Sequence, residues 1–232
     1  GLIDRYEKST EVEDKVRFID SSSLSVVSLE KSDSDKMLPV KYVDIAEDPV
    51  TKNKLGYVTS AFNCAIIGFG ETGKESLKFL YEFGAFANKD NAKAPFKCHI
   101  FDNNLAKELG EFGVDLSTLR SPVAKEPEFE LHSCAVGTIE FLSEMGRLIN
   151  ELNYIVICLG DDNLNVEAAL NVIECAAIEG RDTKEKFCIA IKQTKTSKLN
   201  EETLKNANKA YDNCIHTFGL TENIWKMQHK HY

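Results

Sequence analysis

The chain has 232 residues, of which 43% are hydrophobic and 28% are charged, so it can bury the core of one α/β domain with a small appendage. Its formal net charge of -9 argues against a nucleic-acid-binding surface, because such surfaces normally carry a basic stripe that neutralises phosphates. No apolar run approaches the roughly 20 residues that span a bilayer, so the sequence predicts a soluble protein.

The cysteines lie far apart in the sequence, and no two of them have the C-x-x-C spacing of zinc or redox sites. Several lie inside apolar runs, which predicts buried thiols in a reducing, cytoplasmic compartment. We therefore expect neither a disulfide framework nor a structural metal. His229 and His231 do not indicate a metal either, because two residues on an expected helix that are two apart point to different faces. The cysteines are Cys64, Cys98, Cys134, Cys158, Cys175, Cys188 and Cys214.

Residues 1–60 differ in character from the rest, being polar and charged with only short alternating stretches at 16–19 and 24–29. Those stretches predict strands or a hairpin rather than a core. The Ser-rich residues 20–25 and the charged residues 30–36 are typical of turns or loops. We therefore predict a small N-terminal β extension over residues 1–60, followed by a nucleotide-binding domain over residues 61–232.

From residue 63 onward, short apolar runs alternate with helical patterns, which is typical of βαβ units and a parallel sheet. The resulting fold class is α/β, a doubly wound, mostly parallel six-stranded Rossmann sheet with helices on both faces. The strands are predicted at residues 63–67, 97–101, 128–132, 154–159, 187–191 and 214–217. The helices are predicted at residues 71–83, 139–151, 164–179 and 200–210, with a last amphipathic helix that begins near Thr221 as its N-cap.

Residues 68–73 form a G-x-G-x-x-G motif between a predicted buried strand and a predicted helix. Gly68 permits the tight turn, Gly70 lets the backbone approach a pyrophosphate, and Gly73 lets the helix pack closely on the strand. The helix N-terminus then offers N–H groups and a positive dipole end to the phosphates. The motif predicts nucleotide binding. The alternative is a structural Rossmann turn that has no ligand.

Asp102 ends the second predicted strand, where Rossmann folds carry an acid that accepts hydrogen bonds from the ribose hydroxyls. It lies further from the motif than usual, and the polar stretch 87–95 accounts for the excess as a loop insertion. A carboxylate here would repel a 2′-phosphate, so NAD(H) should bind better than NADP(H). The alternative is that Asp102 only caps the helix that follows.

The fourth predicted strand runs into an Asp-Asp-x-x-Asn turn, residues 161–165. Together with the glycine-rich turn, this resembles the RCK or TrkA-N family, whose domains regulate potassium conductance in bacterial channels and transporters. The resemblance covers residues 63–219. It implies a regulatory domain that senses NAD(H) or another adenine nucleotide such as ADP or ATP. The residues it assigns to the ligand, together with those of the glycine-rich turn, are Gly68, Phe69, Gly70, Glu71, Thr72, Gly73, Asp102, Asn103, Leu159, Gly160, Asp161 and Asn165.

The resemblance also implies partners. Domains of this family generally pair, so we expect a homodimer, with the apolar positions Ile224, Trp225 and Met227 as a candidate contact. Because the chain begins with Gly1 rather than Met, a channel or transporter portion, or another domain, can lie outside this sequence. The protein is then cytoplasmic or on the cytosolic face of a membrane protein.

Three departures from the family pattern concern ligand contacts rather than the fold. Glu71 stands where many members have an Arg that meets phosphate. Residues 133–135 replace the Gly-Asp that holds the adenine end, and the segment 110–127 is longer than usual.

An enzyme that uses nicotinamide needs a proton donor or acceptor near the ring. The sequence has no Tyr-x-x-x-Lys pair, which excludes a short-chain dehydrogenase, and leaves Lys192 and His132 as candidates that we interpret as structural. The leading hypothesis is therefore a regulatory domain without turnover. The alternatives are an NAD-dependent oxidoreductase whose substrate-binding part is absent or built from residues 1–60, and an oligomerisation scaffold with an empty cleft.

Overall fold

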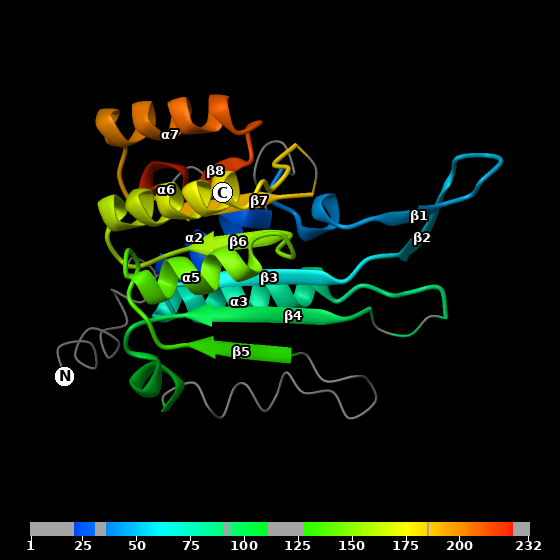
Figure 1. Cartoon of the computed structure of the whole chain (residues 1–232), viewed down its shortest axis with the longest axis horizontal. Coiled ribbons are helices and arrows are strands. Elements are labelled where there is room, and N and C mark those ends of the chain that lie inside the picture. Colours follow the sequence, from blue (N-terminus) through cyan, green and yellow to red (C-terminus); the bar gives the residue numbers. More distant parts are fainter. Residues whose placement is uncertain are drawn as a thin grey trace, which may run out of the picture.

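The computed structural model of the chain describes residues 21–30, 36–90, 92, 94–110, 128–184 and 186–224. Its centre is a six-stranded sheet in the order β5-β4-β3-β6-β7-β8, in which every neighbouring pair is parallel (Figure 1). The strands are β3 (Phe62–Ile67), β4 (Phe96–Phe101), β5 (Glu128–His132), β6 (Tyr154–Ile157), β7 (Cys188–Lys192) and β8 (Ile215–Phe218). This confirms the predicted doubly wound Rossmann sheet, and each strand lies within two residues of its predicted position.

The strand order reverses direction at the centre of the sheet. The chain moves outward from β3 through β4 to β5, returns to the other side of β3 as β6, and then moves outward through β7 to β8. The loops that follow β3 and β6 therefore leave the sheet in opposite directions, which opens a crevice at its carboxyl edge. The central strands are covered on both faces, and every residue of β6 is buried, as expected of a parallel sheet.

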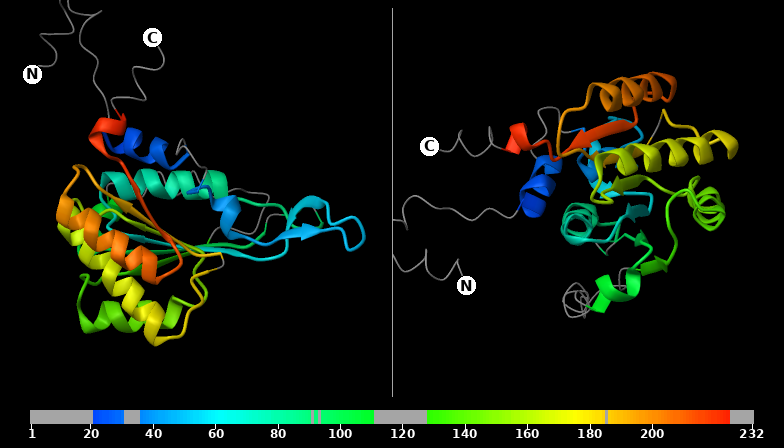
Figure 2. Two further views of the ribbon diagram at one scale, coloured as in Figure 1. Left: turned by 90° about the horizontal axis from the view of Figure 1, so that it is seen from above. Right: turned by 90° about the vertical axis from the view of Figure 1, so that its left-hand side faces the viewer.

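Helices cover both faces of the sheet. Figure 2 shows α2 and α3 on one face and α5, α6 and α7 on the other. Each layer encloses its own hydrophobic cluster. The helices of the main domain are α3 (Glu71–Gly84), α5 (Ile139–Leu148), α6 (Asp162–Ile178) and α7 (Lys198–Ala210), all close to their predicted positions. No helix in the described part of the chain is long and apolar enough to cross a membrane.

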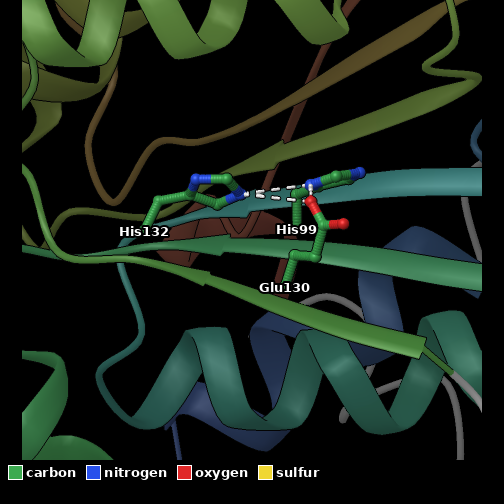
Figure 3. A group of neighbouring side chains, drawn as sticks. All are labelled: His99, Glu130 and His132. Carbon is green, nitrogen blue, oxygen red and sulfur yellow. Dashed lines mark hydrogen bonds and ion pairs between the residues drawn. The ribbon is translucent and has the colours of Figure 1, made fainter.

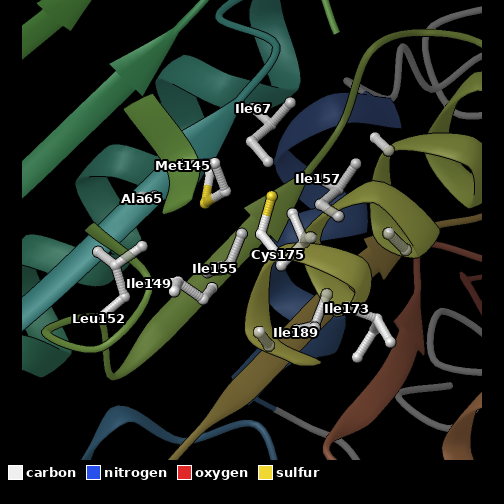
Figure 4. Packing of buried hydrophobic residues seen from close by; sticks show 14 of the residues in the cluster. Ala65, Ile67, Met145, Ile149, Leu152, Ile155, Ile157, Ile173, Cys175 and Ile189 are labelled. Carbon is white, nitrogen blue, oxygen red and sulfur yellow. The ribbon is translucent and has the colours of Figure 1, made fainter. Parts of the chain in front are cut away.

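The cluster between the sheet and α5–α6 is built from alternate residues of the strands (Figure 4). Ile67 of β3, Ile157 of β6 and Met145 of α5 belong to this cluster, and all three side chains are fully buried. Cys175 of α6 packs in the same layer. All seven cysteines are buried and unpaired, as predicted, and burial raises the pKa of the Cys158 thiol to about 12. That thiol therefore stays protonated and behaves as a small apolar side chain.

The N-terminal extension differs from the prediction. Residues 24–29, predicted as strand, belong to the helix α2 (Ser21–Glu30), and part of the predicted turn at 20–25 is helical as well. Val26 and Leu29 are buried in the same cluster as α3, so this segment does contribute to the core. The buried positions 25, 26 and 29 have helical spacing, and packing on α3 decides between the two patterns. Residues 16–19 lie outside the described residues.

A β-hairpin follows, at residues for which the sequence predicted no strand. β1 (Ile45–Glu47) pairs antiparallel with β2 (Lys54–Val58), after the short 3-10 helix η1 (Pro39–Tyr42). The hairpin projects from the end of the sheet opposite the carboxyl edge (Figure 1). The segment before it is anchored to the core, because the buried Tyr154 hydroxyl donates a hydrogen bond of 2.8 Å to the Met37 carbonyl.

Packing of α2 on the main domain predicts a stability effect. Leu29 is fully buried, whereas Leu199 at the start of α7 is 74% exposed. We expect Leu29→Ala to cost roughly 2–5 kcal/mol, which lowers Tm by roughly 4–20 °C in a domain of this size. Leu199→Ala is the matched control and should stay within about 0.5 kcal/mol of the unmodified chain. Equal thermal unfolding curves for the two variants would show that α2 is not part of the folded core.

Candidate functional site

The glycine-rich turn joins β3 to α3, and at two of its positions there is no room for a side chain. Gly68 has φ +94°, and a Cβ there would lie 2.6 Å from the Cys158 carbonyl oxygen. A Cβ at Gly73 would lie 2.2 Å from the Gly68 carbonyl oxygen. Both contacts are far inside van der Waals distance, so residues 68 and 73 are glycines for the reason the motif predicts.

Gly70 is different, because a Cβ built there has no heavy atom beyond its chain neighbours within 4 Å. It is the N-cap of α3 and has no side chain to accept a hydrogen bond from the first turn of the helix. The open side of the turn and the N-terminus of α3 therefore meet at the same place. Helix N-termini of this kind bind anions through their N–H groups and dipole.

A cavity of about 540 Å³ opens over this turn at the carboxyl edge of the sheet. It lies where the loops after β3, β4, β5 and β6 converge. The predicted ligand residues that line it are Gly68, Gly70, Glu71, Thr72, Asp102, Asn103, Leu159 and Gly160. Cys134 and Ala135, which the family resemblance places at the adenine end, line it as well. Sequence reasoning assigned no ligand role to the other lining residues, which are Phe101, Asn104, Glu108, Val136, Cys158 and Leu164.

The remaining predicted ligand residues, Phe69, Gly73, Asp161 and Asn165, do not line the cavity. The side chain of Phe69 is fully buried in the core. Asp161 is the N-cap of α6 and accepts hydrogen bonds from the N–H groups of Asn163 and Leu164. The acidic turn thus supports the loops of the edge rather than facing the cavity.

Asn165 links two of those loops. Its Oδ1 accepts a hydrogen bond of 2.7 Å from the Leu159 N–H, and its Nδ2 donates one of 2.9 Å to the Lys192 carbonyl. The neighbouring Asp162 carboxylate accepts hydrogen bonds from the N–H groups of Thr194 and Lys195. The loop after β6 is therefore tied to the loop after β7.

Of the two roles that the sequence left open for Asp102, the structure shows the capping one, and ribose binding stays a prediction. The Asp102 carboxylate accepts hydrogen bonds of 2.7 Å from the N–H of Asn104, as a cap, and of 2.7 Å from the N–H of Phe69. The second bond ties the glycine-rich turn to the end of β4. The same side chain lines the cavity, and a carboxylate has lone-pair sites for about four hydrogen bonds.

The charged groups around the cavity are mostly acidic. Glu71, Asp102 and Glu108 line it, and none of the described lining residues is Lys or Arg. Lys74 lies behind, with only 7% of its side chain exposed, and pairs with Glu71 at 3.1 Å and Glu108 at 3.0 Å. Burial by itself lowers the pKa of the Lys74 amine, but its hydrogen bonds to Glu108 and Glu71 raise that pKa above its ordinary value. Lys74 therefore stays charged, and its single positive charge is shared between Glu71 and Glu108, so the cavity remains acidic.

The two candidate proton-transfer residues lie outside the cavity wall. Lys192 reaches the turn from β7, and its Nζ donates a hydrogen bond of 2.7 Å to the hydroxyl of Thr72. His132 ends β5, and its ring stacks on Phe101 with the ring centroids 4.3 Å apart.

His132 also belongs to a group that the sequence spacing did not indicate. His99, Glu130 and His132 each place one nitrogen or oxygen within 4.8 Å of the others, which is the separation of metal ligands. Burial lowers the pKa of His99 to about 4, and it also lowers the pKa of His132, so both rings are neutral at pH 7. Trp225, Met227, His229 and His231 lie outside the described residues.

Compared with known proteins, the chain matches no family model, and the curated proteins include no match. The resemblance to the RCK or TrkA-N family therefore stays a prediction from the sequence, which rests on the motifs at residues 68–73 and 161–165.

The close approach at Gly73 predicts a contrast between two glycines of the turn. Gly73→Ala forces a Cβ against backbone and should cost about 3 kcal/mol, lowering Tm by roughly 6–12 °C. Gly70→Ala meets open space and should change stability by less than about 1 kcal/mol. Thermal unfolding of both variants measures the contrast. A larger fall in Tm for Gly70→Ala than for Gly73→Ala would refute the close contact at Gly73.

Proposed function

We propose that the cavity binds an adenine dinucleotide, NAD(H), and that the chain is a regulatory domain of the RCK or TrkA-N type. One observation carries the proposal, the open glycine-rich turn at Gly70 in the wall of a cavity at the crevice of a doubly wound sheet. Ligands of open α/β sheets bind at this crevice, with phosphate on the N-terminus of the first helix.

The contacts along the cavity match the parts of a dinucleotide. The pyrophosphate would lie over Gly70 and Thr72, whose hydroxyl is held by the Lys192 amine. The adenosine ribose would bind Asp102. The adenine would fit the apolar wall that follows β4 and β5, made of Phe101, Cys134, Ala135 and Val136. The second nucleoside would extend past Leu159, Gly160 and Leu164.

The charges favour NAD(H) over ligands with more phosphate charge. Glu71, Asp102 and Glu108 line the cavity. Of the two nearby lysines, Lys74 already pairs with Glu71 and Glu108, and Lys192 lies at the Thr72 hydroxyl, where the pyrophosphate itself would bind. A 2′-phosphate about 4 Å from the Asp102 carboxylate would be repelled by roughly 1–4 kcal/mol, depending on the local dielectric. ATP and NADP(H) carry such extra charge, whereas NAD(H) carries only its pyrophosphate.

The regulatory part of the proposal is supported by what lines the cavity. The described lining residues include no His, Lys or Tyr, the groups that usually exchange a proton with a nicotinamide substrate. An oxidoreductase built on this chain would need those groups from elsewhere. Incubation of the full chain with NADH and a panel of aldehydes and ketones separates the two functions, because steady oxidation of NADH would refute the regulatory role.

Binding should depend on the backbone at Gly70. Gly70→Val adds methyl groups where the pyrophosphate would lie, while meeting no other heavy atom of the protein within 4 Å of its Cβ. We expect isothermal calorimetry to show no NAD(H) binding, with circular dichroism unchanged. Gly146→Ala is the matched control, since its Cβ makes only ordinary contacts on α5, and it should bind as the unmodified chain does. Normal binding by Gly70→Val would place the nucleotide site elsewhere.

The ratio of NAD(H) to NADP(H) affinity tests Asp102. A charge-assisted hydrogen bond contributes roughly 1.5–3 kcal/mol, so Asp102→Ala should weaken NAD(H) by about 10- to 100-fold. The change also removes the bond to the Phe69 N–H, which loosens the turn for both ligands equally. The ratio of NAD(H) to NADP(H) affinity changes only because the variant loses the ribose contact and the repulsion between Asp102 and a 2′-phosphate. We expect the unmodified chain to prefer NAD(H) and the variant to lose that preference; an unchanged ratio would make Asp102 a cap alone.

A further inference from the structure

The group of His99, Glu130 and His132 is formed by the register of two parallel strands. His99 of β4 pairs with Glu130 of β5, and Phe101 pairs with His132 two residues later. Residues two apart on a strand point to the same face, so all three polar side chains converge beneath α5. Figure 3 shows His132 and Glu130 directed toward His99.

We propose that these three residues bind a Zn²⁺ ion. His99 Nδ1 lies 3.1 Å from His132 Nε2 and 3.1 Å from Glu130 Oε2, and the remaining pair, His132 Nε2 and Glu130 Oε2, is 4.0 Å apart. Tetrahedral zinc holds nitrogen and oxygen ligands at about 2.0–2.2 Å, which separates the ligand atoms by roughly 3.3–3.6 Å. The three atoms therefore need to move by only a few tenths of an ångström to share one ion.

The hydrogen-bonding balance within the group favours a cation. All three atoms carry a lone pair when each neutral ring has its proton on its other nitrogen and the carboxylate is ionised. His99 Nδ1 makes two contacts of 3.1 Å, yet it has at most one proton to donate. If His99 Nδ1 carries the proton, His132 Nε2 and Glu130 Oε2 must share it. If His132 Nε2 carries the proton, the lone pair of His99 Nδ1 faces the Glu130 carboxylate. A divalent ion accepts electron density from all three atoms at once.

The outer contacts are also those of a metal site. The other ring nitrogen of His132, Nδ1, lies 3.6 Å from the Glu144 carboxylate of α5. That carboxylate pairs with the Arg147 guanidinium at 2.8 Å. The other carboxylate oxygen of Glu130 lies 2.7 Å from the Lys97 amine. Metal-bound histidines commonly have a carboxylate beside the second nitrogen, which fixes the tautomer and the ring orientation.

The site has a buried side and an open side. The side chain of His99 is 2% exposed and that of His132 11%, whereas Glu130, on the edge strand β5, is 42% exposed. Zinc with three protein ligands usually keeps a fourth position for water. The bound ion would therefore join the edge strand β5 to β4 and still be reached by solvent from the side of Glu130.

The full chain, stripped of metal with a chelator, tests the proposal by titration with Zn²⁺ in calorimetry and thermal unfolding. We expect one ion to bind and to raise Tm. Loss of a residue that only supports a metal ligand typically costs 10- to 100-fold in affinity. Glu130 would bind the ion directly, so Glu130→Gln should weaken Zn²⁺ binding by at least about 100-fold. Glu128→Gln, an exposed position on the same strand, is the matched control and should bind as the unmodified chain does. Equal binding by both variants would overturn the site.

Binding of Co²⁺ to the unmodified chain gives a spectroscopic test that does not depend on whether a variant folds. Co²⁺ bound to the unmodified chain should show the visible spectrum of tetrahedral nitrogen and oxygen ligation without a thiolate charge-transfer band. A thiolate band would assign the metal to one of the seven buried cysteines and overturn the proposal. Absence of any binding by Zn²⁺ or Co²⁺ would do so as well.

Discussion

Two backbone contacts at the start of α3 determine the shape of the carboxyl edge. The Cys158 carbonyl lies against Gly68, and the Gly68 carbonyl lies against Gly73, in each case where a Cβ would clash. Strand β6, the turn and α3 can approach this closely only because those positions have no side chain. The N-terminus of α3 is therefore held directly at the crevice between β3 and β6. Gly70, between the two crowded positions, is left with open space.

Polar side chains complete that edge by bonding to the backbone of neighbouring loops. Asp102 bonds to the turn after β3, Asn165 joins the loops after β6 and β7, and Asp162 holds the start of the segment after β7. The bonds made by Asp102 and Asn165 are partly buried, so loss of either side chain would leave backbone groups of the edge without these partners. Among the acidic residues that the structure describes at this edge, Asp102 both supports the turn and lines the cavity, whereas Asp161 and Asp162 bond to backbone N–H groups and do not line it.

The cavity and the histidine group share a wall. Phe101 lines the cavity on one side and stacks on His132 on the other, and the Asp102 N–H donates a hydrogen bond to the His132 carbonyl. The end of β5 is thus in contact with the segment where the adenine and ribose would bind. Any interaction that holds β5 in register with β4 also holds that wall in place.

The sequence was enough to predict the six strands and the glycine-rich turn, because short apolar stretches alternate with helical patterns from residue 63 onward and the motif at residues 68–73 lies between a strand and a helix. It could not decide whether residues 24–29 form a strand or a helix, since their short apolar pattern fits both and only packing on α3 selects the helix. The tertiary structure alone decided the partners of Asp102 and Asn165, and it alone joined His99 to His132 across 33 residues of chain. These contacts depend on strand register and loop position, which arise from the packed core and leave no local signal in the sequence.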